Sequence, residues 1–493
     1  MPTPRLMAPL WQALTTPPPN GTLTFAPGVT SQTVTVDVRG DGFVENNETL
    51  FLNLTSPTNA LLSNAQATGT ILNDDVPPGS GSISRVSVAS NGTQADNFSA
   101  FPAISTDGRY VVFTSNASNL VTGDTNNLAD SFVRDRLTNQ TTLVSSATTG
   151  LPGNGISTLP AISADGRFVA FSSDANNLVS GDSNNATDIF IHDRTNTQTT
   201  RISVASDGTQ ADGSSQGTVS LSADGRYVVF SSSASNLVAG DTNSTTDIFL
   251  RDRLTDQTTR LNVASDGTQS NGASSNPTIS ADGRYVVFTS NASNLVAGDT
   301  NNQTDIFVRD RQTGDTRRVS VAADGTQANN ASSVASVSGN GRYAVFTSQA
   351  SNLVAGDTNN AADVFVHDLV SGETSRVSVG TDGIQANGSF GAISNDGRYV
   401  AFQSSAVTLT GITAANPLAV FIHDRQTGIT RRASIATDGT LTSGGGDFAI
   451  ALSGDGSVVA FTSAATNLVS TDTNGVADIF VYQRSAGLGP SIE

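Results

Sequence analysis

The sequence predicts an all-β fold, a β-propeller with seven blades. The first observation behind this prediction is a repeat of about 58 residues that runs from about Ser82 to the end of the chain. The second is that each copy contains short runs of β-branched and aromatic residues. The third is an Asx-Gly turn in every copy, at Asp107-Gly108, Asp165-Gly166, Asp224-Gly225, Asp282-Gly283, Asn340-Gly341, Asp396-Gly397 and Asp455-Gly456. A fixed period built from short strands and such turns is typical of a propeller.

The fourth repeat shows the order of strands expected in one blade. Ser275–Ser280 is the innermost strand, and the Asp282-Gly283 turn leads to Tyr285–Phe288, which is apolar on both faces. A strand of that kind must be covered on both sides, as stacking between neighbouring blades does. The third strand is Asp305–Val308, and Arg318–Val321 alternates polar and apolar residues as an outer strand should.

Two phenylalanine positions recur in every repeat and support this register. They are Phe113, Phe171, Phe230, Phe288, Phe346, Phe402 and Phe461 in the second strand, and Phe132, Phe190, Phe249, Phe307, Phe365, Phe421 and Phe480 in the third. Together they use 14 of the 22 phenylalanines, so we expect most of the aromatic content to form the core between blades.

The phase of the repeats predicts how the ring closes. The chain enters the repeats with an outer-strand sequence, Arg85–Val88, and leaves after a third strand, Ile479–Val481. Seven complete blades result only if the N-terminal segment supplies the outer strand of the last blade. This closure removes exposed strand edges.

The repeat also resembles a known family. DGRYVVF at residues 282–288 and DIFVRD at residues 305–310 are similar to the TolB-like propeller repeat, and the resemblance covers roughly Ser82–Arg484. It implies the propeller fold. It leaves function open, because the family ranges from periplasmic scaffolds to gating domains of hydrolases.

Residues 21–75 follow a different pattern, with alternating apolar and polar residues through several strands. The segments Gly21–Phe25, Glu48–Leu50 and Ile71–Asp75 resemble the second half of a Calx-β domain, an antiparallel sandwich that binds calcium in some animal proteins. Half a sandwich leaves one face and an edge uncovered, so we expect it to be marginal alone. Residues 76–81 are expected to be a linker and residues 485–493 a tail.

Residues 1–20 lack strand patterning and hold the only tryptophan and both methionines. Allowed codons read in another frame can spell a stretch typical of a Calx-β domain. We therefore expect a non-native leader from a frameshifted or truncated gene model, with the real protein extending further. The alternative is an unrelated disordered leader.

Composition limits the classes of partner. The chain of 493 residues has no cysteine, which excludes disulfides and zinc-thiolate sites, and its net charge is −18. This charge argues against nucleic acid or an anionic membrane and favours cations and basic surfaces. No apolar run reaches the roughly 18 residues of a membrane span. The acidic composition, rich in Asn, Thr and Ser, indicates an exported bacterial protein, and we expect a monomer.

A recurring loop with the pattern D-x-N-x-x-x-D is the strongest chemical candidate. Its members are Asp124, Asn126 and Asp130; Asp182, Asn184 and Asp188; Asp241, Asn243 and Asp247; Asp299, Asn301 and Asp305; Asp357, Asn359 and Asp363; and Asp472, Asn474 and Asp478. Side-chain oxygens at this spacing are similar to those of calcium loops, although calcium needs about 6–8 ligands. The alternative is that they form structural Asx-turns.

Two details bound this metal prediction. Repeat six breaks the loop with Ala414–Pro417, so we expect no ion there. Asp135 lies five strand residues beyond Asp130, about 16 Å away, and cannot share its ion. In the Calx-β segment, the resemblance matches Asp41, Glu45, Glu48, Asp74 and Asp75 to acidic positions of calcium-binding relatives, with the ligands of the missing half absent.

A ring of polar residues is expected on the same face as these loops, near the mouth of the central channel. Its members are Asp96, Asn154, Asp212, Asn271, Asn329 and Asn387. Such a ring can bind a cation or a basic peptide, or it can be solvated turn.

The sequence offers little for catalysis. The innermost strands carry no acid or base, and no G-x-S-x-G motif occurs. His192, His367 and His423 share one strand position with Arg134 and are expected at its solvent end rather than in one site. The sequence therefore predicts a non-catalytic, exported binding protein with calcium as cofactor and a protein or peptide partner on its acidic face. The alternatives are a metal-independent TolB-like scaffold and, third, a propeller hydrolase or lyase.

Overall fold

The structure is a computed structural model that describes residues 22–32, 34, 48–71, 81–409, 418–436, 439–442 and 449–485. The chain divides into two compact units, Met1–Asp75 and Val76–Glu493. None of the described residues forms a helix long and apolar enough to cross a membrane.

The first unit contains one antiparallel pair of strands, β1 (Glu48–Asn53) and β2 (Gln66–Ile71). Their register places Glu48 opposite Ile71 and Asn53 opposite Gln66. Large apolar side chains of this unit are exposed: Phe25 is 53% and Phe51 57% accessible. The described part of the unit thus has apolar surface without a covering layer, as expected for half a sandwich.

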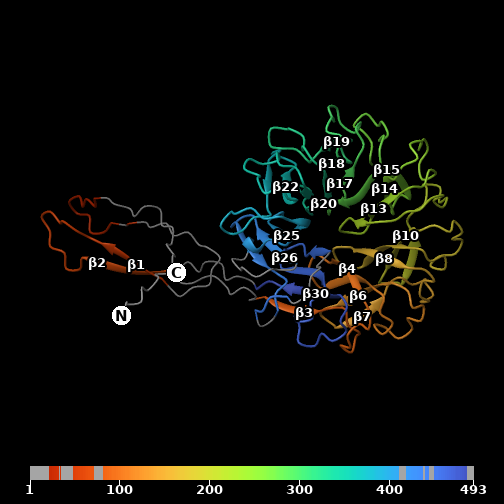
Figure 1. The fold of residues 1–493 in the computed structure, drawn as a ribbon, viewed down its shortest axis with the longest axis horizontal. Coiled ribbons are helices and arrows are strands. Elements are labelled where there is room, and N and C mark those ends of the chain that lie inside the picture. The colour runs from red at the N-terminus through yellow and green to blue at the C-terminus, as the bar shows by residue number, and fades with distance from the viewer. Residues whose placement is uncertain are drawn as a thin grey trace, which may run out of the picture. The chain divides into compact units, whose positions relative to one another are not determined.

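The second unit is a ring of seven four-stranded antiparallel sheets, seen as the blades in Figure 1. The blades are β4 to β7, β8 to β11, β12 to β15, β16 to β19, β20 to β23, β24 to β27, and β28 to β30 with β3. The innermost strands contact one another around the axis. The seven-bladed all-β prediction is confirmed.

Strands at equivalent places in the blades cover similar positions of the repeat. The innermost are β4 (Ser99–Ile104), β8 (Ser157–Ile162), β12 (Ser220–Leu221), β16 (Ser274–Ile279), β20 (Ser332–Val337), β24 (Ser389–Ile393) and β28 (Ile450–Leu452). The second are β5 (Tyr110–Ser115), β9 (Phe168–Ser173), β13 (Tyr227–Ser232), β17 (Tyr285–Ser290), β21 (Tyr343–Ser348), β25 (Tyr399–Ser404) and β29 (Val458–Ser463).

The third strands are β6 (Asp130–Asp135), β10 (Asp188–Asp193), β14 (Asp247–Asp252), β18 (Asp305–Asp310), β22 (Asp363–Asp368), β26 (Ala419–Asp424) and β30 (Asp478–Gln483). The outer strands are β7 (Gln140–Leu143), β11 (Gln198–Arg201), β15 (Gln257–Arg260), β19 (Asp315–Arg318), β23 (Thr374–Arg376), β27 (Ile429–Arg432) and β3 (Ser82–Arg85). A short 3₁₀ helix, η1 (Val407–Leu409), lies in the sixth blade.

The core is formed by the two phenylalanine positions and the aliphatic residues around them. Within each blade the two rings pair across the second and third strands, with centroids 5.9–6.1 Å apart. One apolar cluster joins Val112 and Val133 of the first blade to Phe171 and Phe190 of the second. The aromatic content is therefore core between blades, as the sequence predicts.

The first strand of the propeller closes the ring. β3 pairs antiparallel with β30, with Ser82 opposite Gln483 and Arg85 opposite Phe480, and Figure 1 shows the orange β3 beside the blue β30. The predicted closure is confirmed, but the predicted bounds of the outer strand are wrong. The strand ends at Arg85 because Ser87 diverts the chain: its hydroxyl donates to Asp478 at 2.6 Å and accepts the Ile479 amide at 3.0 Å.

The Asp-Gly-Arg turns connect the first strand of a blade to its second, at the end opposite to the loops that lead into the third strand. Residues beside these turns contact the neighbouring blade. Arg109 Nε and Nη2 donate to the two carboxylate oxygens of Asp135 at 2.9 and 2.7 Å. The guanidinium groups of Arg109 and of Arg194 in the next blade lie 4.7 and 4.4 Å from the centroid of the Tyr110 ring. Asp135 is therefore held at the end of β6 opposite to Asp130, as the strand length predicts.

Candidate functional site: the Asp/Asn loops and their arginines

The D-x-N-x-x-x-D segments connect the second strand of each blade to the third. They meet the loops that lead from an outer strand to the next innermost strand: Asn126 Nδ2 donates to the carbonyl of Gly153 at 2.8 Å, and Asn301 Nδ2 donates to that of Ala328 at 3.0 Å. We call the surface formed by these two sets of loops the loop face. The predicted common face is confirmed by these bonds.

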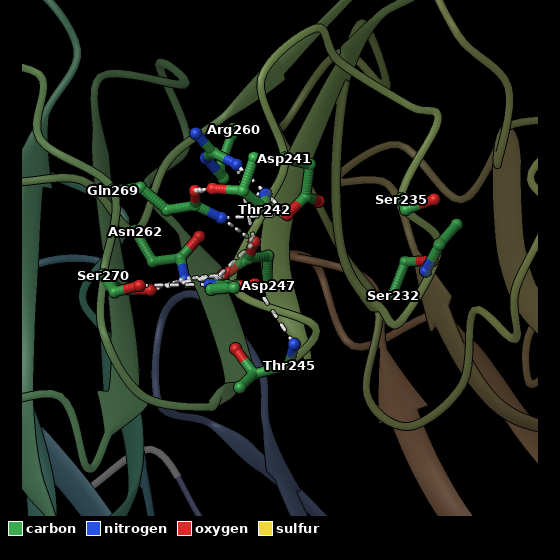
Figure 2. A network of polar contacts seen from close by, with 12 residues as sticks. Ser232, Ser235, Asp241, Thr242, Thr245, Asp247, Arg260, Asn262, Gln269 and Ser270 are labelled. Carbon is green, nitrogen blue, oxygen red and sulfur yellow. Dashed lines mark hydrogen bonds and ion pairs between the residues drawn. The ribbon is translucent and has the colours of Figure 1, made fainter.

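The third blade shows the arrangement in full (Figure 2). Arg260, the last residue of β15, places Nη1 3.4 Å from Asp241 Oδ1 and 3.7 Å from Asp247 Oδ2. Gln269 Nε2 donates to Asp241 Oδ1 at 2.8 Å. Asn243 Nδ2 donates to Asp247 Oδ1 at 3.1 Å, and Asn243 Oδ1 accepts the Thr245 amide at 3.1 Å. The two aspartates thus share one guanidinium.

Five blades repeat this arginine bridge. In each, Nη1 lies 3.1–3.4 Å from the first aspartate and 3.2–3.9 Å from the last. The arginines are Arg201, Arg260, Arg318, Arg376 and Arg85. Nine residues further along the chain each is followed by a glutamine of the same network, Gln210, Gln269, Gln327, Gln385 and Gln94. A positive charge of the chain itself therefore lies where a metal ion would have to bind.

The first blade keeps the acidic groups and lacks the arginine. Leu143 stands opposite Phe132, as Arg260 stands opposite Phe249. Asp130 is fully buried, accepts from Ser145 Oγ at 2.6 Å and from Asn126 Nδ2 at 2.7 Å, and burial raises its pKa to about 6. Burial also raises the pKa of Asp124, whose Oδ1 has no hydrogen-bond partner among the described residues.

The sixth blade shows the reverse: it keeps the arginine and lacks the aspartate at the start of its third strand. Ala419 stands where the other third strands begin with aspartate, and the broken loop at residues 414–417 lies outside the described residues. Arg432 is retained, and it donates to the carbonyl of Ser434 at 2.8 Å and to Thr442 Oγ1 at 2.7 Å.

The predicted calcium sites stay a prediction. Within the described part of the chain, no group of three or more His, Cys, Asp or Glu side chains is close enough to hold a metal ion. In the Calx-β segment, Asp41, Glu45, Asp74 and Asp75 lie outside the described residues, and Glu48 is described only as the start of β1.

The residues of the predicted polar ring mainly form hydrogen bonds that hold one loop to the adjacent loop. Asn271 Oδ1 accepts the amide of Ser293 at 2.9 Å, and Asn329 Oδ1 accepts that of Ser351 at 3.0 Å. Asp96 accepts both the amide and the hydroxyl of Ser118 at 2.9 Å. Asn154 and Asp212 accept a backbone amide of the adjacent loop in the same way, whereas Asn387 Nδ2 donates to Ser405 Oγ at 2.8 Å.

An open polar cavity of about 460 Å³ lies on the loop face at the fifth blade. Its lining includes Asn330, Gln349, Ser351 and Asn360, and it borders Asp357. The sequence analysis missed this cavity, because it arises where the loops of two neighbouring blades meet.

The innermost strands carry a second feature that the sequence does not reveal. One residue in or shortly before each innermost strand has a positive φ, between 46° and 97°: Phe101, Leu159, Gly217, Asn276, Val334, Phe390 and Ala449. In several of these strands the register with the second strand shifts at this point. A β-branched residue in this region is uncommon. Gly217 and Asn276 are of residue types that favour this conformation, and the other five are not.

The predicted position of the three histidines is wrong in one respect. His192, His367 and His423 do not lie at a solvent end: all are buried, with each Nδ1 2.8–2.9 Å from a threonine hydroxyl. Burial lowers their pKa to about 4. They sit in three separate blades, so each is a local replacement for an arginine such as Arg134, which bonds the equivalent Thr141.

Comparisons place these observations among known proteins. A family model described as the Calx-beta domain matches residues 17–75. No match is found among curated proteins. An oligogalacturonate lyase from Vibrio parahaemolyticus is 12% identical, with a TM-score of 0.52, over 90% of this chain and 98% of that one. An oligogalacturonate lyase in complex with manganese is 13% identical with the same coverage and TM-score. TolB from Acinetobacter baumannii is 15% identical over 68% of this chain and 63% of that one, with a TM-score of 0.38.

These comparisons correct the prediction that the protein is not an enzyme. Two of the similar propellers are lyases, so this fold carries catalysis and cannot be used to exclude it. Uncharged innermost strands do not exclude catalysis, since a propeller can build its active site from loops as well.

The architecture is identified by the repeat motifs, by the seven blades with their N-terminal closure and by the family match. The second unit is a seven-bladed β-propeller closed by its own first strand, and residues 17–75 match the Calx-beta domain.

Proposed function

We propose that this protein is an exported binding scaffold whose propeller takes a basic peptide segment of a partner protein on its loop face. The cavity beside Asp357 is the observation that carries the proposal, because it is open, polar and about 460 Å³ in volume. Amide and hydroxyl groups line it, and such groups pair with an extended peptide backbone.

Charge supports a basic partner rather than an acidic one. The net charge of −18 attracts cationic segments over distances of about one Debye length, roughly 10 Å at 0.1 M salt. The proposed site outside the cytoplasm is supported by the acidic composition rich in Asn, Ser and Thr. Fractionation of cells expressing the complete gene tests that location.

We keep calcium binding in the proposal, but only for the Asp/Asn loop that has no arginine. Five of the six loops already hold a guanidinium between their aspartates. A metal ion would have to displace it, at the cost of leaving a buried arginine unpaired. The loop without an arginine is the place where calcium meets no such competitor.

Fluorescence anisotropy with labelled peptides tests the partner proposal. We expect an Arg/Lys-rich peptide to bind and a Glu-rich peptide of equal length not to bind, with affinity falling as salt rises from 50 to 500 mM, a range over which ionic screening increases strongly. Asn330→Arg with Gln349→Arg in the cavity should weaken binding. Leu254→Arg, in the β14–β15 turn at the opposite end of the blades, is the control. Equal binding of both peptides, or equal loss in the control, would count against the proposal.

A further inference from the structure

We propose that the first blade takes a hard divalent cation from solution between Asp124 and Asp130, in the place that an arginine fills in five other blades. Calcium is the ion of first choice. The inference deepens the metal-binding part of the proposed function and does not depend on the peptide partner.

The comparison among blades carries the first step. The arginine bridge consists of four parts: two aspartates, one arginine and one glutamine nine residues after it. The first blade replaces the arginine by Leu143 and the glutamine by Pro152, which occupies the same bridge position opposite Ser146 as Gln269 does opposite Val263. The arginine and the glutamine are thus both absent from the first blade, while both aspartates and Asn126 remain.

The acidic groups are left without compensation in a buried place. Asp124 is 8% accessible and Asp130 is fully buried. Among the described residues, no arginine or histidine forms an ion pair with either of them. Asp124 Oδ1 lacks any partner there. The other carboxylate oxygen that lacks a hydrogen bond, Asp363 Oδ2, has Arg376 at 3.9 Å. Among the described residues, a buried carboxylate oxygen without a hydrogen bond or a facing arginine is therefore found only in the first blade.

The sixth blade shows that the groups can be lost together. Where the acidic loop is broken, Leu441 replaces the glutamine, and Arg432 turns to Ser434 and Thr442. In the first blade both aspartates stand without the arginine, and a bound cation would replace its charge.

The chemistry of the site favours calcium over other cations. The ligands are oxygens only, which suits hard cations, and calcium accepts irregular shells of 6–8 oxygens that include carbonyls and water. Magnesium demands a near-ideal octahedron at 2.0–2.1 Å. Asp124 lies in the chain between the exposed residues Gly123 and Thr125.

Calorimetric titration of the full chain with calcium chloride tests the inference, with thermal unfolding as a second measurement. We expect the number of bound calcium ions to fall by one in Leu143→Arg with Pro152→Gln, which converts the first blade to the pattern of the other five. Asp124→Asn should weaken that site by at least the roughly 10–100-fold typical of changes around metal ligands. Magnesium should bind more weakly than calcium.

Two controls keep the test decisive. Unfolding in EDTA checks that each variant is folded, and if the double variant is not, Asp124→Asn alone decides. Calcium held by the Calx-β segment would be unchanged in both variants, so only the difference from the wild type counts. No saturable calcium binding, or the same number of ions in wild type and both variants, would overturn the inference. Peptide binding measured in EDTA reports separately on the proposed partner.

Discussion

Arg85 Nη1 lies 3.4 Å from Asp472 Oδ1 and 3.6 Å from Asp478 Oδ2, although Arg85 belongs to the first strand of the propeller and the aspartates to its last loop and last strand. The arginine bridge that stabilises a loop inside four other blades here ties the two ends of the propeller together. One local motif therefore also closes the ring.

Deletion of residues 82–89 should open the propeller. The last blade would lose its outer strand, the edge of β30 would be exposed, and Asp478 would lose Ser87 as well as Arg85. We expect a lower melting temperature, a broader transition and aggregation, measured by calorimetry and light scattering. Arg85→Ala should show a smaller effect in the same direction. A deletion variant that melts and stays soluble like the wild type would contradict the role of β3.

Replacement of Arg260 by leucine should copy the first blade into the third. Asp241 and Asp247 would remain buried without their guanidinium, and breaking a buried ion pair costs about 3–5 kcal/mol. We expect a lower melting temperature in EDTA that calcium restores in part. The reverse change, Leu143→Arg, should raise the melting temperature in EDTA. If both changes act in the same direction, the arginine bridge is not what stabilises these loops.

Gly166→Ala should destabilise a junction between blades. Gly166 has a φ of +75°, and an added Cβ would collide with the Tyr110 ring of the preceding blade. Gly181→Ala is a matched control, because its φ is +77° and nothing lies within 4 Å of the added atom. The control carries only the backbone penalty of about 1 kcal/mol, whereas overpacking adds about 1–3 kcal/mol at Gly166. Equal melting temperatures for the two variants would mean that the ring contact is unimportant.

The buried histidines should make the propeller sensitive to acid. Each has a pKa of about 4 in the folded state against an ordinary value of 6.5, so the folded protein binds fewer protons between these two values. Stability is fully present above pH 6.5 and falls as the pH decreases toward 4, by up to about 3 kcal/mol per histidine. Asp130, with its pKa raised to about 6, acts in the opposite sense.

Unfolding measured from pH 7 to pH 4 checks this expectation. Replacement of His192, His367 and His423 by glutamine should flatten the pH profile, and Asp130→Asn should steepen it. An unchanged profile in the triple variant would show that the histidines do not titrate as described.

Much of the fold follows from the sequence because its signals are local and repeated. The Asx-Gly turns require a left-handed residue, and the strand that contains Phe288 is apolar on both faces, so blade stacking is implied. The N-terminal phase even predicts the pairing of β3 with β30. The bounds of the outer strands could not be predicted, because Ser87 and its equivalents compete for backbone hydrogen bonds in a way that alternation does not reveal.

The sequence by itself determined the seven blades, their closure and the set of Asp/Asn loops. Only the tertiary structure decided what faces those loops. Arg260 is separated from Asp241 by a whole strand and a turn, and β14–β15 pairing brings them to 3.4 Å. The equivalent β6–β7 pairing places Leu143 opposite Phe132, at the position of Arg260, where it supplies no charge. In loops with the same sequence pattern, the charge of the aspartates is therefore neutralised where the neighbouring strand carries arginine and is left without a cation where it carries leucine. The reason is that electrostatic interactions depend on distance in space and on burial.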